Sequence, residues 1–318
     1  MKHFTNAYLA LAFVCIVWGT TFLAIRVGVL HYPPFLFAAV RQTAAGLIIM
    51  LTGWLMYRKA DLSGKWLWRQ AKIGFLMITV GNGVVSWAEQ YVPSGVTALV
   101  CAIMPIFTVV FNLMTPPRER LSAVVLTGML TGLGGVALIF RDSISDLANL
   151  GYLTGILGLL VSTAGWALGS VIALRPPKMP VNALLDAGLQ VTFGGIFLFC
   201  SSALLDDFSN FSWWQAEAFW SLVYLIIFGS VLAYTAYMYT LKKLPVGLAT
   251  IYAYVNPLVA VVLGYWLMDE QLTIWTILSF ILIVGSVFIV RQGYRKQKKT
   301  AAGSAVTATG VSYEPHKK

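Results

Sequence analysis

Charged residues are scarce in this sequence. Asp, Glu, Lys and Arg make up 11% of its 318 residues, whereas 58% are hydrophobic. A soluble globular domain has about 25% charged and about 45–50% apolar residues. Because this chain has too little polar surface to cover a globule in water, the composition excludes a soluble protein. The uncharged runs Leu9–Ile25, Ile73–Ala88 and Ile274–Val290 match the roughly 17–25 residues that a helix needs to cross a bilayer.

Histidine and cysteine are also rare, with three of each, and their positions exclude several kinds of site. They are His3, His31, His316, Cys15, Cys101 and Cys200. The histidines lie outside the apolar runs, so we expect no intramembrane metal or haem. The cysteines lie inside these runs, where we interpret them as small buried hydrophobes without a disulfide or metal role. Phosphate-binding glycine loops, nucleophilic triads and the HExxH motif are absent. We therefore expect no cofactor, no enzymatic activity and no ATP-driven transport.

Hydropathy predicts ten transmembrane helices, with boundaries good to a few residues. The predicted spans are 7–27, 34–57, 71–90, 94–114, 121–140, 151–173, 181–205, 217–240, 246–267 and 273–291. The first apolar run, Ala7–Ile25, ends at Arg26 without a convincing cleavage site, so we interpret it as a permanent span. The basic, then small and polar segment 292–318 is predicted to be a disordered cytoplasmic tail.

Basic and acidic residues alternate between successive loops, which predicts the orientation of the chain. Lys and Arg occupy the loops after the second, fourth, sixth and eighth spans and the C-terminal tail, whereas acidic residues such as Asp142, Asp206 and Asp269 occupy the intervening loops. Basic loops stay in the cytoplasm, so both termini should be cytoplasmic. The net charge of +10 is then explained by contact with anionic lipid rather than with nucleic acid.

The two halves of the chain resemble each other. Val92–Gly95 opens a predicted helix that contains Pro105, and Leu244–Gly247 opens one that contains Pro257. Five helices per copy is an odd number, so the two copies must insert in opposite directions. The sequence thus predicts an all-α integral membrane fold of ten transmembrane helices as two inverted five-helix repeats, at 7–141 and 151–291. Such repeats commonly surround a solute site near the membrane midplane.

Several of these landmarks together resemble one family. They are Trp18-Gly19-Thr20-Thr21-Phe22, Arg26, Pro33-Pro34, Ala39-Val40-Arg41, Val92-Pro93-Ser94-Gly95 and Ala253-Tyr254-Val255-Asn256-Pro257. They are similar to the EamA family of the drug/metabolite transporter superfamily, and the stretches 81–95 and 237–257 are especially similar to its PecM/YedA-like branch. The resemblance covers residues 7–291. It implies a ten-helix inverted-repeat fold and the export or exchange of small solutes, including amino acids, without naming a substrate.

Four charged residues fall within or near the predicted spans. Arg41 lies about two turns into the second span, where it is either part of a structural ion pair or a cavity charge that receives an anionic or zwitterionic solute. Arg26 is expected to extend to the interface. Glu89 is a candidate for proton coupling, or else an interfacial residue paired with Arg26 or Arg41. Asp186 is expected at the interface.

Two prolines and two asparagines are further candidates. Pro105 and Pro257 each free backbone carbonyls within a span, and their matched positions favour a gating or site-lining role over two static kinks. Asn256 could satisfy the freed backbone or bind solute, and Asn82 is another polar group at membrane depth.

Deep aromatic residues complete the predicted site, although core packing is the alternative for each of them. The predicted substrate-binding residues are Arg41, Trp18, Asn82, Trp87, Trp166, Tyr237, Tyr252 and Asn256. Glycine pairs spaced by four are too common in membrane helices to predict a dimer, so the oligomeric state stays open.

These observations favour a secondary transporter in the bacterial inner membrane. Its expected partners are a small-molecule metabolite and the lipid bilayer, with no nucleic acid, and proton coupling is left open. The family resemblance implies export by rocking of the two repeats about a midplane cavity. The alternatives are an intramembrane enzyme, a lipid flippase, and a non-transport membrane sensor. The enzyme is disfavoured because the spans lack histidine.

Overall fold

The computed structural model describes residues 2–56, 63–115, 122–139, 149–175, 182–209, 211–212, 214–268 and 274–309. Within them the first five helical runs are α1 (Lys2–Val29), α2 (Pro34–Met56), α3–η1–α4 (Gly64–Gly74, Phe75–Gly83, Val84–Ala88), α5–α6 (Ser94–Cys101, Met104–Met114) and α7 (Ala123–Ile139). The next five are α8 (Leu150–Leu174), α9 (Ala183–Leu205), α10–η3–α11 (Ala216–Tyr224, Leu225–Leu232, Ala233–Lys243), α12–α13 (Val246–Ala249, Tyr252–Met268) and α14 (Ile274–Thr309).

Membrane dimensions account for the lengths of these helices. Eight runs among the described residues are long and apolar enough to cross a bilayer, and Ala123–Gly135 in α7 forms a shorter apolar helix. All backbone polar groups must be satisfied inside hydrocarbon, which a helix achieves within itself. The predicted all-α membrane fold is therefore confirmed.

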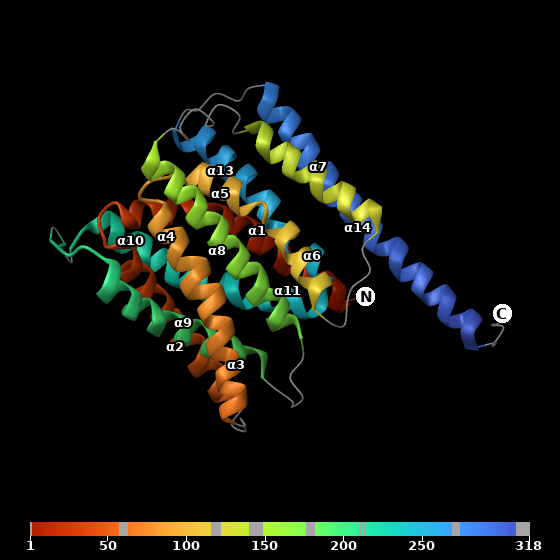
Figure 1. The fold of residues 1–318 in the computed structure, drawn as a ribbon, viewed down its shortest axis with the longest axis horizontal. Coiled ribbons are helices and arrows are strands. Elements are labelled where there is room, and N and C mark those ends of the chain that lie inside the picture. The colour runs from red at the N-terminus through yellow and green to blue at the C-terminus, as the bar shows by residue number, and fades with distance from the viewer. Residues whose placement is uncertain are drawn as a thin grey trace.

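The helices pair reciprocally across the two halves. Helix α2 packs on α9 and α7 packs on α14, while α1 packs on α11 and α13, and α8 packs on η1 and α6. The contacts of α1 with the eighth and ninth runs correspond to the contacts of α8 with the third and fourth runs. Two halves related by a two-fold axis require this correspondence. Figure 1 shows α7 and α14 side by side at one edge of the bundle.

Small residues allow the central helices to approach closely. A side chain at Gly46 in α2 would collide with the backbone of Thr192 in α9, and one at Gly188 in α9 would collide with the backbone of Met50. Without a hydrophobic driving force between helices in lipid, such close packing is a main source of stability. The start of α2 is held in addition by Asp206, whose carboxylate accepts from the backbone N–H groups of Phe35 (3.2 Å) and Leu36 (2.8 Å).

Two helices differ from the predicted bounds. The third run begins at Gly64 rather than at residue 71, because the basic residues of its first turns find hydrogen-bond partners at this end of the bundle. Arg69 Nη2 there donates to the carbonyl oxygens of Ile172 (2.9 Å) and Arg175 (2.6 Å). Helix α14 continues to Thr309, so residues 292–309 differ from the predicted disordered tail. Ala, Lys and Gln, all good helix formers, are frequent there.

Several sequence predictions fall outside the described residues. They concern segments 57–62, 116–121, 140–148, 176–181, 269–273 and 310–318. These segments hold several of the loop charges that predict orientation, including Asp142 and Asp269, and the predicted end of the first repeat at residue 141. The bounds 7–141 and 151–291 and the position of the termini stay predictions.

Candidate functional site

A pocket lies in the middle of the bundle and is built from both halves of the chain. Its cavity volume is about 90 Å³. Its polar lining comprises Thr21, Arg41, Gln42, Asn82, Ser162, Thr163, Ser230 and Asn256, and its aromatic lining comprises Trp18, Phe22, Trp166, Tyr234 and Tyr252. A concave, mostly apolar space with a few convergent polar groups is the usual form of a small-molecule site.

Arg41 supplies a buried positive charge to this pocket. Arg41 is 3% exposed, and its Nε donates to Ser230 Oγ at 2.9 Å. Its Nη1 is buried and has no hydrogen-bond partner among the described residues. A buried cationic donor without a partner is costly. The guanidinium is therefore available to a ligand that brings a carboxylate or another anionic group.

An aromatic cluster packs beside the pocket. The Trp18 ring lies 4.7 Å from Tyr252, 5.1 Å from Tyr237 and 5.4 Å from Trp166, measured between ring centroids. Tyr237 is fully buried, and its hydroxyl shares a hydrogen bond with Ser170 Oγ at 2.8 Å. Tyr237 thus supports the pocket-lining rings from behind and is not itself part of the lining.

Two π-helical segments, η1 and η3, occupy corresponding places in the third and eighth runs. In η1 the Gly81 carbonyl accepts from Ser162 Oγ of α8 at 2.6 Å, and in η3 the Gly229 carbonyl accepts from Trp18 Nε1 of α1 at 2.9 Å. A π-helical turn displaces carbonyls from the regular pattern and is frequent at functional sites. These segments therefore help to position the pocket, although apart from their glycines no sequence signal predicts them.

Glu89 is buried within the protein. The residue is 0% exposed, and neither carboxylate oxygen has a hydrogen-bond partner among the described residues. The positive charges that act on it are those of Arg26 and Arg41. Glu89 does not line the pocket. Its negative charge instead offsets the positive charges of Arg26 and Arg41. Its predicted role in proton coupling stays a prediction.

The interruptions of the fourth and ninth runs lie at the level of the pocket. Pro105 is the second residue of α6, just after the break between α5 and α6, whereas Pro257 lies inside α13, well after the break between α12 and α13. The two prolines therefore stand differently relative to their breaks. The Asn256 amide satisfies its hydrogen bonds when its nitrogen faces two backbone carbonyls. In this orientation it donates to the carbonyl oxygens of Tyr252 (2.9 Å) and Cys15 (3.2 Å).

The structure brings six of the eight predicted substrate-binding residues to the pocket. They are Trp18, Arg41, Asn82, Trp166, Tyr252 and Asn256. Trp87 instead packs on Tyr91, with 5.4 Å between ring centroids, and lines a separate cavity with His31 and Asp206. Tyr237 lies behind the lining. The small hydroxyl residues and Gln42 in the lining could not be predicted from the sequence, because residue type alone does not reveal which way such a residue faces.

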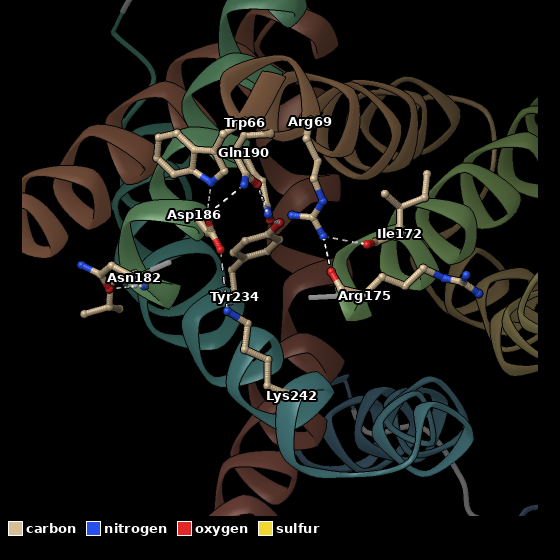
Figure 2. Close-up of polar contacts among 11 residues, drawn as sticks. Trp66, Arg69, Ile172, Arg175, Asn182, Asp186, Gln190, Tyr234 and Lys242 are labelled. Atoms are coloured by element: carbon tan, nitrogen blue, oxygen red, sulfur yellow. Dashed lines mark hydrogen bonds and ion pairs between the residues drawn. The ribbon is translucent and has the colours of Figure 1, made fainter. Parts of the chain in front are cut away.

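Asp186 is buried in a polar network at one end of the bundle. Its Oδ1 accepts from Trp66 Nε1 (2.9 Å) and Gln70 Nε2 (2.8 Å), and its Oδ2 lies 3.7 Å from Lys242 Nζ. Figure 2 shows these groups together with Arg69 and the end of α8. Donors from α3 and α11 replace the water that a carboxylate near a helix start would otherwise need. The predicted position of Asp186 at the membrane interface stays a prediction.

The fold defines a polytopic α-helical membrane protein with a pocket in the middle of its helix bundle. The sequence model of the EamA-like transporter family matches residues 5–141 and again residues 153–292. The chain belongs to this family, as the motif resemblance predicted.

Named relatives agree with this assignment. The chain is 36% identical to the "Uncharacterized inner membrane transporter YedA" of Escherichia coli (strain K12), over 89% of this chain and 90% of the relative. It is 26% identical to the protein PecM of Dickeya dadantii (strain 3937), over 86% and 89%. A solved crystal structure superposes with a TM-score of 0.73 at 21% identity, covering 92% of this chain and 98% of the other, which shows the shared fold.

Proposed function

We propose that this protein is a secondary transporter that exports amino acids or similar small metabolites across the bacterial inner membrane. Transport would proceed by alternating access, with the two halves rocking about the central pocket. One observation carries the proposal: the Arg41 guanidinium lies in the wall of this pocket with Nη1 unpartnered among the described residues. The names of the relatives supply the transporter class and the membrane.

The chemistry of the pocket supports a zwitterionic or anionic solute with an apolar part. Arg41 would bind the carboxylate, as guanidinium groups commonly do. Hydroxyl and amide groups of residues such as Thr163 and Asn82 offer hydrogen bonds, and the rings of Trp18 and Trp166 offer an apolar surface. Because the site combines one charge with adaptable small polar groups, we expect it to accept several related metabolites.

The distribution of basic residues supports cytoplasmic termini. Arg69, Arg175 and Lys242 gather at one end of the bundle, as Figure 2 shows. Basic residues concentrate on the cytoplasmic side of bacterial inner-membrane proteins. The N-terminus and the C-terminus would then both be cytoplasmic.

The proposal is tested by the extracellular metabolite profile of cells that express the protein. Cells with the intact protein are compared with cells expressing Arg41→Ala at equal membrane abundance, and with an empty vector. We expect a set of metabolites that is enriched outside only with the intact protein. Identical profiles for all three strains across varied nutrient loads would overturn export, and equal export by both proteins would remove Arg41 from the site.

A further inference from the structure

An unbroken chain of hydrogen bonds connects Asp186 to the wall of the pocket. Gln70 Nε2 donates to Asp186 Oδ1 at 2.8 Å, and Gln190 Nε2 donates to Gln70 Oε1 at 2.7 Å. Tyr234 Oη then donates to Gln190 Oε1 at 2.8 Å, and Tyr234 lines the pocket. The chain passes through α9, α3, α9 again and α11, so it joins the two halves of the protein.

The direction of this chain follows from the charge of the carboxylate. An ionised carboxylate only accepts hydrogen bonds, so Gln70 must present its NH₂ group to Asp186 and its oxygen to Gln190. Gln190 must then present its NH₂ group to Gln70 and its oxygen to Tyr234. The Tyr234 hydroxyl is left as the donor. The charge at Asp186 therefore decides where the hydroxyl hydrogen of a pocket residue points.

Protonation of Asp186 allows the same chain to run in reverse. The new carboxyl O–H can donate to Gln70 Oε1, after which both amides turn over and Gln190 donates to Tyr234 Oη. The Tyr234 hydrogen must then point elsewhere, either into the pocket or toward Met77 Sδ, 3.9 Å away. A proton bound at Asp186 thus converts Tyr234 from a donor to Gln190 into a donor to another acceptor.

The surroundings of Asp186 are suited to a proton-binding site. Its side chain is 4% exposed, whereas that of its partner Lys242 is 35% exposed and so reaches the water at this end of the bundle. The charges that act on Asp186 come from Lys242 on α11 and Arg69 on α3. Helix α2 packs on this part of α9 through Met50 and Gly53 and brings no titratable side chain.

We propose that Asp186 is a proton-binding site whose charge state sets the hydrogen bonding of Tyr234 in the pocket wall and holds α11 against α9. Ionised Asp186 holds α11 at two points, through Lys242 and, by way of the chain, through Tyr234. Neutral Asp186 weakens the Lys242 contact and releases the Tyr234 hydroxyl from Gln190. The proposal rests on the proposed function only in taking the pocket as the site of the transported solute.

Infrared difference spectroscopy of the purified protein in lipid tests this link without any substrate. Spectra are recorded between about pH 4 and about pH 9, with ring-labelled tyrosine and the variant Tyr234→Phe to assign the C–O stretching band of Tyr234. We expect a protonated-carboxyl band to appear as the pH falls and the Tyr234 band to shift with the same midpoint. Asp186→Asn should lose both changes.

Two further variants make the result specific. Gln190→Leu cuts the chain but leaves every contact of Asp186, so the carboxyl band should still titrate while the Tyr234 band no longer follows it. Glu89→Gln removes the other carboxylate that is buried among the described residues and should leave both changes in place. A Tyr234 band that is independent of pH in the intact protein, or that still shifts in Asp186→Asn or Gln190→Leu, overturns the proposal. If export fails but these spectra behave as expected, the proton link stands without the proposed function.

Discussion

At the scale of single residues, the position of Arg41 matters most. Its Nε donates to the Ser230 hydroxyl on the opposite half of the protein, while its Nη1 is buried without a hydrogen-bond partner among the described residues. Glu89 acts as a counter-charge to Arg41, but the missing hydrogen bond of Nη1 costs free energy unless a ligand supplies it. The residue is thus better suited to binding than to stability.

Replacing Arg41 with Ala should lower export about tenfold to a hundredfold. This is the effect of losing a charged hydrogen bond of roughly 1.5–3 kcal/mol. Ser230→Ala is the matched control, because it removes one partner of Arg41 but keeps the charge, and it should cost less than tenfold. Efflux rates from preloaded cells measure both variants. A larger loss in Ser230→Ala than in Arg41→Ala would contradict this account of the charge.

Glu89 should contribute to stability as the counter-charge of Arg26 and Arg41. Glu89→Gln leaves the two arginines uncompensated, and we expect it to lower the free energy of unfolding by about 3 kcal/mol. The thermal unfolding midpoint of the purified protein measures this change. The double variant Arg26→Met with Glu89→Gln should recover part of the loss. Unchanged stability in Glu89→Gln would show that the carboxylate is not needed as a counter-charge.

The depth of the site residues could be predicted from the sequence, but not the direction in which they point. Arg41 and Trp18 stand out because a charge or a polar ring at membrane depth costs free energy and is usually found at a functional site. Trp87 carries the same signal, yet it faces Tyr91 and Gly158. Tyr234 is one of several deep tyrosines in the sequence, and only its bond to Gln190 distinguishes it.

At the scale of elements, close contact between α2 and α9 forms the centre of the bundle. Gly46→Ala places a methyl group against the backbone of Thr192, and we expect it to lower the free energy of unfolding by about 1–3 kcal/mol. Gly134→Ala is the control, since nothing lies within 4 Å of its side-chain position. That control should be neutral or slightly stabilising because Ala favours helix. Unfolding midpoints in detergent compare them, and equal midpoints would contradict the packing argument.

The π-helical segments should depend on their partners in the opposite half. Trp18→Phe leaves the Gly229 carbonyl unpaired, and Ser162→Ala does the same for Gly81. Each should lower the free energy of unfolding by about 1–3 kcal/mol, the cost of an unsatisfied buried group. Hydrogen exchange of η1 and η3 checks the location of the effect: Ser162→Ala should increase exchange in η1 and Trp18→Phe in η3. Exchange that increases uniformly along the chain would argue against a local role.

Most elements could be predicted because the length of an apolar run determines a membrane helix directly. The early start of α3 could not, since its basic residues lower the hydropathy while Arg69 bonds to carbonyls of α8, a contact invisible in sequence. The π-helical segments also escaped prediction. Their cause is tertiary, namely the approach of Ser162 and Trp18 to the glycine carbonyls.

At the scale of the whole molecule, both halves contribute residues to one central pocket. Arg41 and Asn82 come from the first half, and Ser162 and Tyr252 from the second. Any relative movement of the halves must therefore change the pocket. The network around Asp186, which also spans both halves, would change with it.

The central claim is that the pocket opens to each side of the membrane in turn, and Cys101 allows a direct test. Cys101 lines the pocket, whereas Cys15 and Cys200 do not, so Cys15→Ala and Cys200→Ala leave a single reporter thiol. Right-side-out and inside-out vesicles are treated with a small, negatively charged methanethiosulfonate that cannot cross the membrane. We predict that Cys101 is modified from both faces, and that the metabolites exported only by the intact protein slow the reaction. Modification from one face alone, or from neither, would contradict alternating access at this pocket.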